Sequence, residues 1–278
     1  MTTKTLPAPR ETPIHALGRA VTRTIELMGD VGLFALCLIP KLFLRMPRGQ
    51  FIPLCFQIGV RSVIVIMITG GFIGMVLAVQ SYSQLKLFHV ETRIGAMITM
   101  SIVSELGPVL AATMLAGRIG SAIAAELGTM KVTEQIEALK ALGANPVHYL
   151  VAPRFFACLL MIPLLTAVAD VTGIVSAWVF CSEMLGIDTF HYWHHVSQIV
   201  TAYDVVGGLA KSIFFGAAIA IISCHRGFRS AGGAEGVGRA ATESFVFSFV
   251  TILVLDFVLG VFINKLYYLI WPNPLLST

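Results

Sequence analysis

The stretch VIVIMITGGFIGMVLAVQ, residues 63–80, decides the class of fold because it carries no charge over almost the length of a bilayer-spanning helix. It belongs to a run of 24 uncharged residues between Arg61 and Lys86. Of the 278 residues, 56% are hydrophobic and 12% are charged, about half the charged fraction of ordinary soluble domains. The sequence therefore predicts an all-α membrane protein.

Four further apolar runs follow, each interrupted by a single charged residue. The interrupting residues are Glu105, Asp170, Lys211 and Asp256. We therefore expect residues 49–278 to form one permease domain with five transmembrane helices, approximately 60–82, 94–118, 155–180, 205–225 and 244–266.

The N-terminal region differs from these spans in its composition. Residues 1–13 are polar and proline-rich, which predicts a disordered cytoplasmic tail with no signal peptide. Within residues 14–48, the stretch VGLFALCLIPKLFL (31–44) has too few apolar residues before Pro40 and Lys41 to cross a membrane. We expect an interfacial or elbow helix there.

The distribution of Lys and Arg predicts the orientation. Eight lie at or before Arg61, two in the next connection, four between 118 and 154, none between 183 and 204, three between 226 and 239, and one after the last span. This alternation predicts a cytoplasmic N-terminus and a C-terminus on the outer side.

Counted along each predicted helix from its cytoplasmic basic residue, the four interrupting charges share one depth, roughly 20–25 Å into the membrane. Buried charges at this depth usually face a protein interior or a watery cavity. We expect Glu105 to pair with Lys211. Two interpretations remain open: the charges line a transport cavity, or they are structural ion pairs that hold the helices together.

Two short motifs also allow more than one interpretation. A GxxxG pair, Gly70 and Gly74, predicts close helix packing, either within one chain or in a homodimer. HYWHH, residues 191–195, lies in the predicted external loop and suits an aromatic belt at the membrane interface better than a zinc site.

The predicted cytoplasmic loop after the second span contains a short amphipathic helix at about 131–143. Thr133 is the expected cap, Ile136, Leu139 and Leu142 form an apolar stripe, and Gly143 ends the helix. Such a stripe predicts docking onto another protein, or a position on the membrane surface. The chain contains no GxxxxGK[ST] motif, so we expect no ATP hydrolysis by a P-loop here.

Several of these segments occur together in a known family. FIGMVLAVQ, ELGPVLAATMLAGRIGSAIAAELGTMKVTEQIEAL, PRFFACLLMIPLLT, GGAEGVGRAAT and LDFVL, in this order between about 50 and 265, resemble the MlaE-type permeases. That family forms the transmembrane subunit of an ABC-type phospholipid transporter that maintains outer-membrane lipid asymmetry in Gram-negative bacteria.

The resemblance implies a non-enzymatic transport subunit in the bacterial inner membrane, with a periplasmic C-terminus. It implies a homodimer bound to cytoplasmic ABC ATPase subunits that carry ATP and Mg, a small regulatory subunit, and a periplasmic MCE-type lipid-binding hexamer. Phospholipid is the implied substrate, with no cofactor on this chain and no nucleic acid. The alternative from another class is a proton-coupled secondary transporter that uses the intramembrane carboxylates.

The resemblance also implies roles for particular residues. Glu105, Lys211 and Tyr82 match positions of the family's lipid cavity. An amphiphile also needs apolar walls, and we expect positions such as Leu77 and Leu106 to supply them. The helix carrying Glu134, Ile136, Glu137 and Leu139 matches the coupling helix that contacts the ATPase. Some relatives have an arginine where this chain has Ser104, so a headgroup contact through that arginine does not carry over.

Overall fold

The computed structural model describes residues 29–38, 40, 48–88 and 93–270, together with Thr22 and Glu26. Within these ranges the secondary structure is helical and contains no strand, which confirms the all-α prediction. Five helical segments are long and apolar enough to cross a membrane, as predicted. The predicted tail, residues 1–13, lies outside the described residues.

The first three spans contain π-helical turns, in which the backbone hydrogen bonds close over five residues rather than four. The first span consists of α2 (Arg48–Cys55), η1 (Phe56–Val60) and α3 (Arg61–Leu87). The second consists of α4 (Ile94–Ser101), η3 (Ile102–Leu106), α5 (Gly107–Leu115), η4 (Ala116–Gly120) and α6 (Ser121–Val132). The third consists of η5 (Val147–Val151) and α8 (Ala152–Glu183), and the last two are α10 (Ala202–Phe228) and α11 (Gly233–Ile270).

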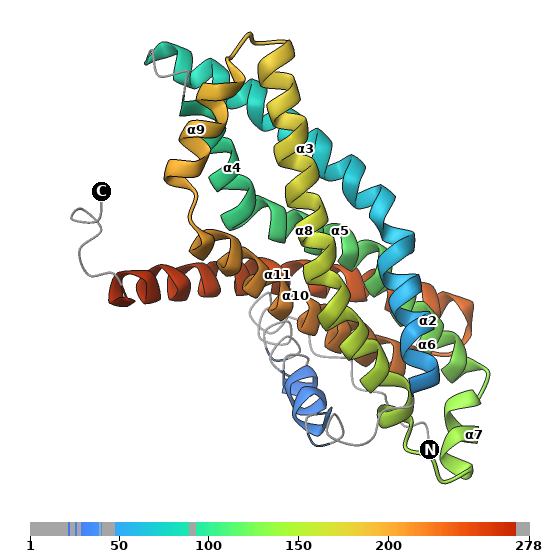
Figure 1. Ribbon diagram of the computed structural model, residues 1–278. Helices are drawn as coiled ribbons and strands as arrows, with labels where there is room; N and C mark the ends of the chain where they lie inside the picture. Colours follow the sequence, from blue (N-terminus) through green and yellow to red (C-terminus); the bar gives the residue numbers. More distant parts are fainter. Residues whose placement is uncertain are drawn as a thin grey trace, which may run out of the picture.

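Two short helices mark opposite ends of the molecule (Figure 1). Helix α7 (Gln135–Ala141) follows the second span, and α9 (Thr189–Ile199) follows the third. We call these the α7 end and the α9 end. Helices α3 and α8 run together between the two ends, whereas α11 crosses the view of Figure 1.

The helices extend beyond the predicted apolar limits, most clearly in α11. The sequence predicted this span from about residue 244, but the helix already begins at Gly233. Its first turns are held by charges: Glu243 accepts from Arg239 at 2.9 Å and lies 3.2 Å from Arg226 Nη1 on α10. Hydropathy marks only the part of a helix that suits hydrocarbon, so it missed this polar extension.

The GxxxG pair of α3 packs against α8 of the same chain. A Cβ placed on Gly70 would lie 2.8 Å from the Ala169 carbonyl oxygen, and one on Gly74 would overlap the Gly173 carbonyl. The hydroxyl of Ser176 donates to the Gly71 carbonyl at 2.8 Å across the same contact. Packing within one chain, the first of the two interpretations of this motif, therefore accounts for it.

Helix α9 packs onto α4 through a buried tyrosine. The ring of Tyr192 lies against Gly95, where an added Cβ would come within 2.9 Å of it. Tyr192 is buried, so it belongs to the core rather than to the predicted aromatic belt, while Trp193 is 40% exposed. The expected loop is a helix here because it has an apolar side that Gly95 can accommodate.

Helix α7 lies within the predicted range 131–143, but its start differs. The Thr133 hydroxyl donates to the Thr129 carbonyl at 2.9 Å, because α6 continues through Val132 and uses this residue in its last turn. The turn into α7 is made instead by Glu134 in the left-handed region, at φ 57°. Gly143, at φ 77°, follows the end of the helix as predicted.

In the predicted interfacial region 14–48, the structure describes a short apolar helix, Gly29–Leu38. Its Leu38 side chain is buried in the core, and Asp30 forms an ion pair with Arg229 just after α10. The ring of Phe34 lies 5.5 Å from that of His225. The helix is thus attached to α10, and its position at a membrane surface stays a prediction.

The α3–α8 contact gives a test by matched glycines. Replacing Gly74 with alanine should lower the stability of the folded chain by about 2 kcal/mol, because the methyl group would overlap the α8 backbone. Gly71→Ala is the control, since its Cβ would lie at an ordinary 3.9 Å from Ser176. The melting temperature of each variant is measured in mild detergent, with size-exclusion chromatography after each heating step to detect the folded fraction. Equal melting temperatures for the two variants would contradict the described packing.

Candidate functional site

The candidate site begins at a proline in the second span. In a regular α-helix the N–H of residue 108 would donate to the carbonyl of Ser104, but Pro108 has no N–H. The preceding residues form the π-helical turn η3, and Lys211 Nζ of α10 donates to the Ser104 carbonyl at 3.1 Å. The backbone is therefore irregular beside Glu105, and a lysine from another helix satisfies the freed carbonyl.

Lys211 is the centre of a three-residue charge cluster. Its ammonium donates to Glu105 Oε2 at 2.7 Å and lies 3.2 Å from Asp256 Oδ1 of α11. The Lys211 side chain is only 2% exposed, whereas that of Glu105 is 51% exposed. The predicted Glu105–Lys211 pair is present, and Asp256 joins it. With all three groups ionised, the cluster carries one net negative charge.

Glycines allow the three helices to meet at this cluster. A Cβ on Gly208 of α10 would overlap the Val103 carbonyl of η3, so the two backbones touch there. A Cβ on Gly260 of α11 would lie 3.6 Å from Lys211 Nζ and 3.7 Å from Glu105 Oε1. Gly260 thus leaves the Glu105 carboxylate half-exposed toward the space beside α11, while the Lys211 side chain stays buried behind it.

That space is a hollow of about 540 Å³ between the second span, α10 and α11. Each helix contributes residues at helical spacing, so the polar and apolar groups mix along its wall. The lining residues are Met100, Ser101, Ser104, Glu105, Ile199, Thr201, Tyr203, Asp204, Gly207, Gly208, Lys211, Gly260, Ile263, Asn264 and Tyr267. Its size lies within the range of small-molecule sites, roughly 300–1,000 Å³.

Polar contacts close the hollow toward the α9 end. The Tyr203 hydroxyl donates to the Ile263 carbonyl at 2.8 Å, and its ring lies 5.2 Å from that of Tyr267. Asp204 caps the start of α10 by accepting from the Thr201 backbone at 2.9 Å. Sequence reasoning missed these residues, although Asp204 lies at helical spacing before Lys211 and Tyr267 at helical spacing after Asp256.

The other predicted cavity residues lie elsewhere in the single chain. Leu106 lines a small separate hollow beside Gly70 of α3. Leu77 and Tyr82 pack against the hydrophobic cluster around Tyr192 at the α9 end, and Lys86 lies 5.4 Å above the Tyr82 ring. Of the five, only Glu105 and Lys211 line the larger hollow, and the lipid-binding role of all five stays a prediction.

Asp170 shares the predicted depth of the charge cluster but not its position. It is buried on α8 with its Oδ1 close to Gly107, where there is no space for a side chain. It does not line the larger hollow. Depth along a helix identifies charged residues at one level, but the rotation of each helix decides which of them meet.

At the α7 end, the predicted coupling residues divide by exposure. Ile136 is buried in the core and Leu139 packs partly against it, so these two anchor α7 to its own chain. Glu134 and Glu137 are exposed, and Leu142 is 82% exposed. Lys131 Nζ donates to the Ser230 carbonyl at 2.9 Å, which joins this end to the turn between α10 and α11.

The three histidines at 191–195 lie on α9. In the described part of the chain, no group of three or more His, Cys, Asp or Glu side chains is placed to hold a metal ion. The ring of His194 instead stacks on Phe190, with centroids 5.6 Å apart.

Comparison with known proteins gives consistent matches over most of the chain. The family model described as permease MlaE matches residues 51–262. A probable ABC transporter permease protein of Rickettsia typhi is 38% identical over 244 residues, covering 85% of this chain and 93% of that protein. A probable ABC transporter permease protein of Synechocystis is 41% identical over 216 residues, or 78% and 82% of the two chains.

A third relative has a more specific name. The intermembrane phospholipid transport system permease protein MlaE of Haemophilus influenzae is 34% identical over 248 residues, covering 88% of this chain and 95% of that protein. All three matches therefore cover most of both chains.

The charge cluster predicts a particular pattern of stability. Lys211→Met should destabilise the chain by about 3 kcal/mol, because it leaves two carboxylates and the Ser104 carbonyl without their shared donor. Adding Asp256→Asn to Lys211→Met should recover part of that loss, because it removes the repulsion between the carboxylates. Melting temperatures in detergent measure both variants. A double variant no more stable than Lys211→Met would show that the carboxylates do not interact.

Proposed function

This chain belongs to the MlaE permease family, and from that premise we propose that it is the membrane-spanning subunit of an ATP-driven phospholipid transporter. As a family member it is an ABC transporter permease, a transport subunit rather than an enzyme. The phospholipid substrate is suggested by the name of the Haemophilus influenzae relative. In the proposal, lipids move between the inner membrane and periplasmic lipid-binding partners, which maintains outer-membrane asymmetry.

The observation that carries the proposal is the hollow beside Glu105, Lys211 and Asp256. A phospholipid needs a polar position for its headgroup and apolar walls for its acyl chains. The ammonium of Lys211 and the half-exposed carboxylate of Glu105 offer the first, and side chains such as Met100 and Ile263 offer the second. Burying an ionisable group inside a membrane protein costs desolvation free energy, and such groups commonly mark a substrate pathway.

The proposed assembly places this chain in the bacterial inner membrane as a homodimer. Cytoplasmic ABC ATPase subunits would carry ATP and Mg, each with a small regulatory subunit, and a periplasmic MCE-type hexamer would receive or deliver lipid. The α7 end would face the cytoplasm, as the distribution of Lys and Arg predicts. The exposed Glu134, Glu137 and Leu142 support α7 as the contact with the ATPase.

Helix α11 supports a second copy of the chain as a neighbour. Its apolar window is 11% buried within the single chain, less than in any of the other four spans. The exposed side chains include Phe249, Leu253, Phe257 and Phe262. In the proposed homodimer, a second copy would cover part of this surface, which also borders the hollow through Gly260.

A proton-coupled secondary transporter remains the competing proposal, since Glu105 lines the hollow and Asp256 shares its partner Lys211. The relatives named as ABC transporter permeases favour the ATP-driven reading. A pH-gradient-driven flux by the purified chain without any ATPase would favour the competitor.

Lipid bound to the purified chain tests the proposed substrate. We expect native mass spectrometry of the tagged chain, extracted from its own membranes in mild detergent, to find a dimer with ATPase subunits and bound phospholipid. Glu105→Gln and Lys211→Ala should each lower phospholipid occupancy about tenfold, because each removes a charged contact to the headgroup. Glu183→Gln, at the exposed end of α8, is the matched control. If both variants fold and transport lipid normally, the cavity proposal fails.

Binding of the ATPase tests the role of α7 separately. Reversing the exposed charge in Glu137→Lys, or adding one in Leu142→Glu, should strongly reduce the ATPase that copurifies with the chain, because both side chains lie on its exposed surface. Glu183→Lys makes the same charge change near the α9 end and should leave the copurified amount unchanged. Undiminished ATPase in both α7 variants would direct the search for the contact elsewhere.

A further inference from the structure

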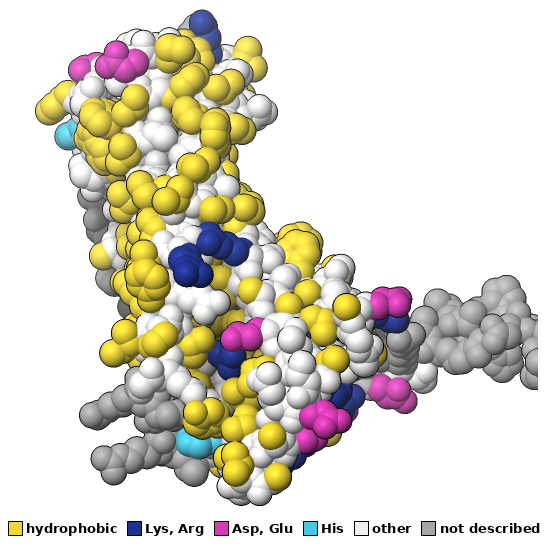
Figure 2. All heavy atoms as spheres, turned by 90° about the vertical axis from the view of Figure 1, so that its right-hand side faces the viewer, with side chains coloured by type: hydrophobic (Ala, Val, Ile, Leu, Met, Phe, Trp, Pro, Cys, Tyr) yellow, Lys and Arg dark blue, Asp and Glu magenta, His cyan; other side chains and the backbone are white. Residues whose placement is uncertain are grey.

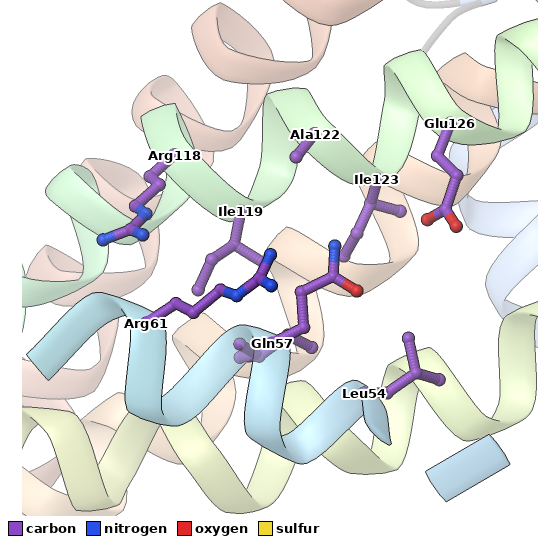
Figure 3. A pocket seen from close by; sticks show the side chains of 9 residues that line it. Leu54, Gln57, Arg61, Arg118, Ile119, Ala122, Ile123 and Glu126 are labelled. Atoms are coloured by element: carbon purple, nitrogen blue, oxygen red, sulfur yellow. The ribbon is translucent and has the colours of Figure 1, made fainter. Parts of the chain in front are cut away.

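Two arginines at the α7 end lie apart from the charge cluster and have no acidic partner in the described part of the chain. Arg61 begins α3, and Arg118 belongs to η4 of the second span. Both line a hollow of about 140 Å³ together with Gln57. In Figure 3 the two side chains enter the same gap from opposite helices, and the Gln57 amide lies beside Arg61.

The carboxylate of this hollow is already engaged. Glu126 lies at the far end of the gap from Arg118 (Figure 3), and its Oε2 is 2.9 Å from the buried Arg154 guanidinium. The rest of the lining is apolar: Leu54, Ile58, Ile119, Ala122 and Ile123. Two like charges in apolar surroundings repel one another, and an anion between them would offset that repulsion.

The depth of the two arginines fits the headgroup layer of a membrane. Arg61 lies 26 residues before Leu87, and Arg118 lies 24 residues after Ile94, which places both about 36–39 Å along their helices from the α9 end. A bilayer with its headgroups is about 40 Å thick. Figure 2 shows Lys and Arg side chains at the surface among hydrophobic side chains on one face of the molecule.

We infer that Arg61 and Arg118 bind the phosphate of a phospholipid from the leaflet at the α7 end, at a lateral site separate from the Glu105–Lys211 hollow. Guanidinium groups bind phosphate through paired charge-assisted hydrogen bonds, and Gln57 adds an amide donor. The hollow has room for a phosphate but not for a whole lipid. The acyl chains would follow the exposed Val65, Ile68 and Phe72, which continue the Arg61 face of α3 toward the membrane centre.

This site does not rest on the proposed transport function, because it needs only a membrane around the chain. The test uses the full chain with a photoreactive phenylalanine in place of Ala122. The chain is reconstituted in vesicles of phosphatidylethanolamine and phosphatidylglycerol whose headgroup phosphates are radiolabelled. We expect illumination to attach labelled lipid to the chain. The label should fall about tenfold in the Arg61→Gln/Arg118→Gln variant and be retained largely in Arg61→Lys/Arg118→Lys.

Three controls give the result its meaning. The same probe at Val79, exposed near the α9 end of α3, should collect label that does not depend on the arginines. The Glu105→Gln variant, which alters the Glu105–Lys211 hollow but keeps the buried Lys211, should keep its label at Ala122, so a failure of the transport proposal would leave this result intact. Size-exclusion chromatography identifies any variant that does not fold, and the single variants Arg61→Gln and Arg118→Gln, each expected to lose label, then carry the comparison.

Several outcomes would overturn the inference. Label at Ala122 that persists in the folded glutamine variant would mean that the arginines do not hold the lipid. Loss of the label in excess inorganic phosphate would mean that the site takes soluble phosphate rather than a headgroup. An adduct between two copies of the chain, in place of lipid, would assign the two arginines to a protein interface.

Discussion

The contacts of the Lys211 ammonium are the interactions on which the centre of the molecule depends. Inside a bilayer every polar group needs a partner from the protein, and Lys211 serves three that would otherwise be unpaired or repelling. It donates to the Ser104 carbonyl, which Pro108 leaves free, and to Glu105, and it lies beside Asp256. One side chain thereby fixes the positions of three helices, η3 with its neighbours, α10 and α11.

Glycine makes this arrangement sterically possible and also produces the hollow. Gly208 lets α10 touch the second span, while Gly260 leaves open space where α11 passes the ion pair. The helices touch at Gly208, whereas beside Gly260 the half-exposed Glu105 carboxylate faces the hollow. The structural and functional interpretations of the charge cluster are therefore compatible, because the same ion pair can hold the helices and present a polar wall.

The sequence predicts the class of fold, the five spans and the Glu105–Lys211 pair, because hydropathy and charge spacing are local properties. It does not predict that Asp256 joins the pair while Asp170 faces Gly107, because helix rotation and the π-helical turn η3 decide this. Thr133 failed as a cap for a similar reason, since α6 continues through Val132. Tyr82 was placed by resemblance, and Leu77 and Leu106 as apolar walls that an amphiphile would need. The single chain brings none of the three to the hollow.

The second span gives the molecule a direct connection between its two ends. It runs as one helical segment from Ile94 to Val132, with Glu105 11 residues after its start, Arg118 14 residues before its end, and α7 just beyond that end. Its π-helical turns, η3 and η4, hold Glu105 and Arg118 respectively, and such turns are often found at functional sites. A partner that displaces α7 would therefore act on both polar positions through a single element. Because Lys211 binds η3 directly, any rotation of that element must also change the contacts of α10 and α11 at the hollow.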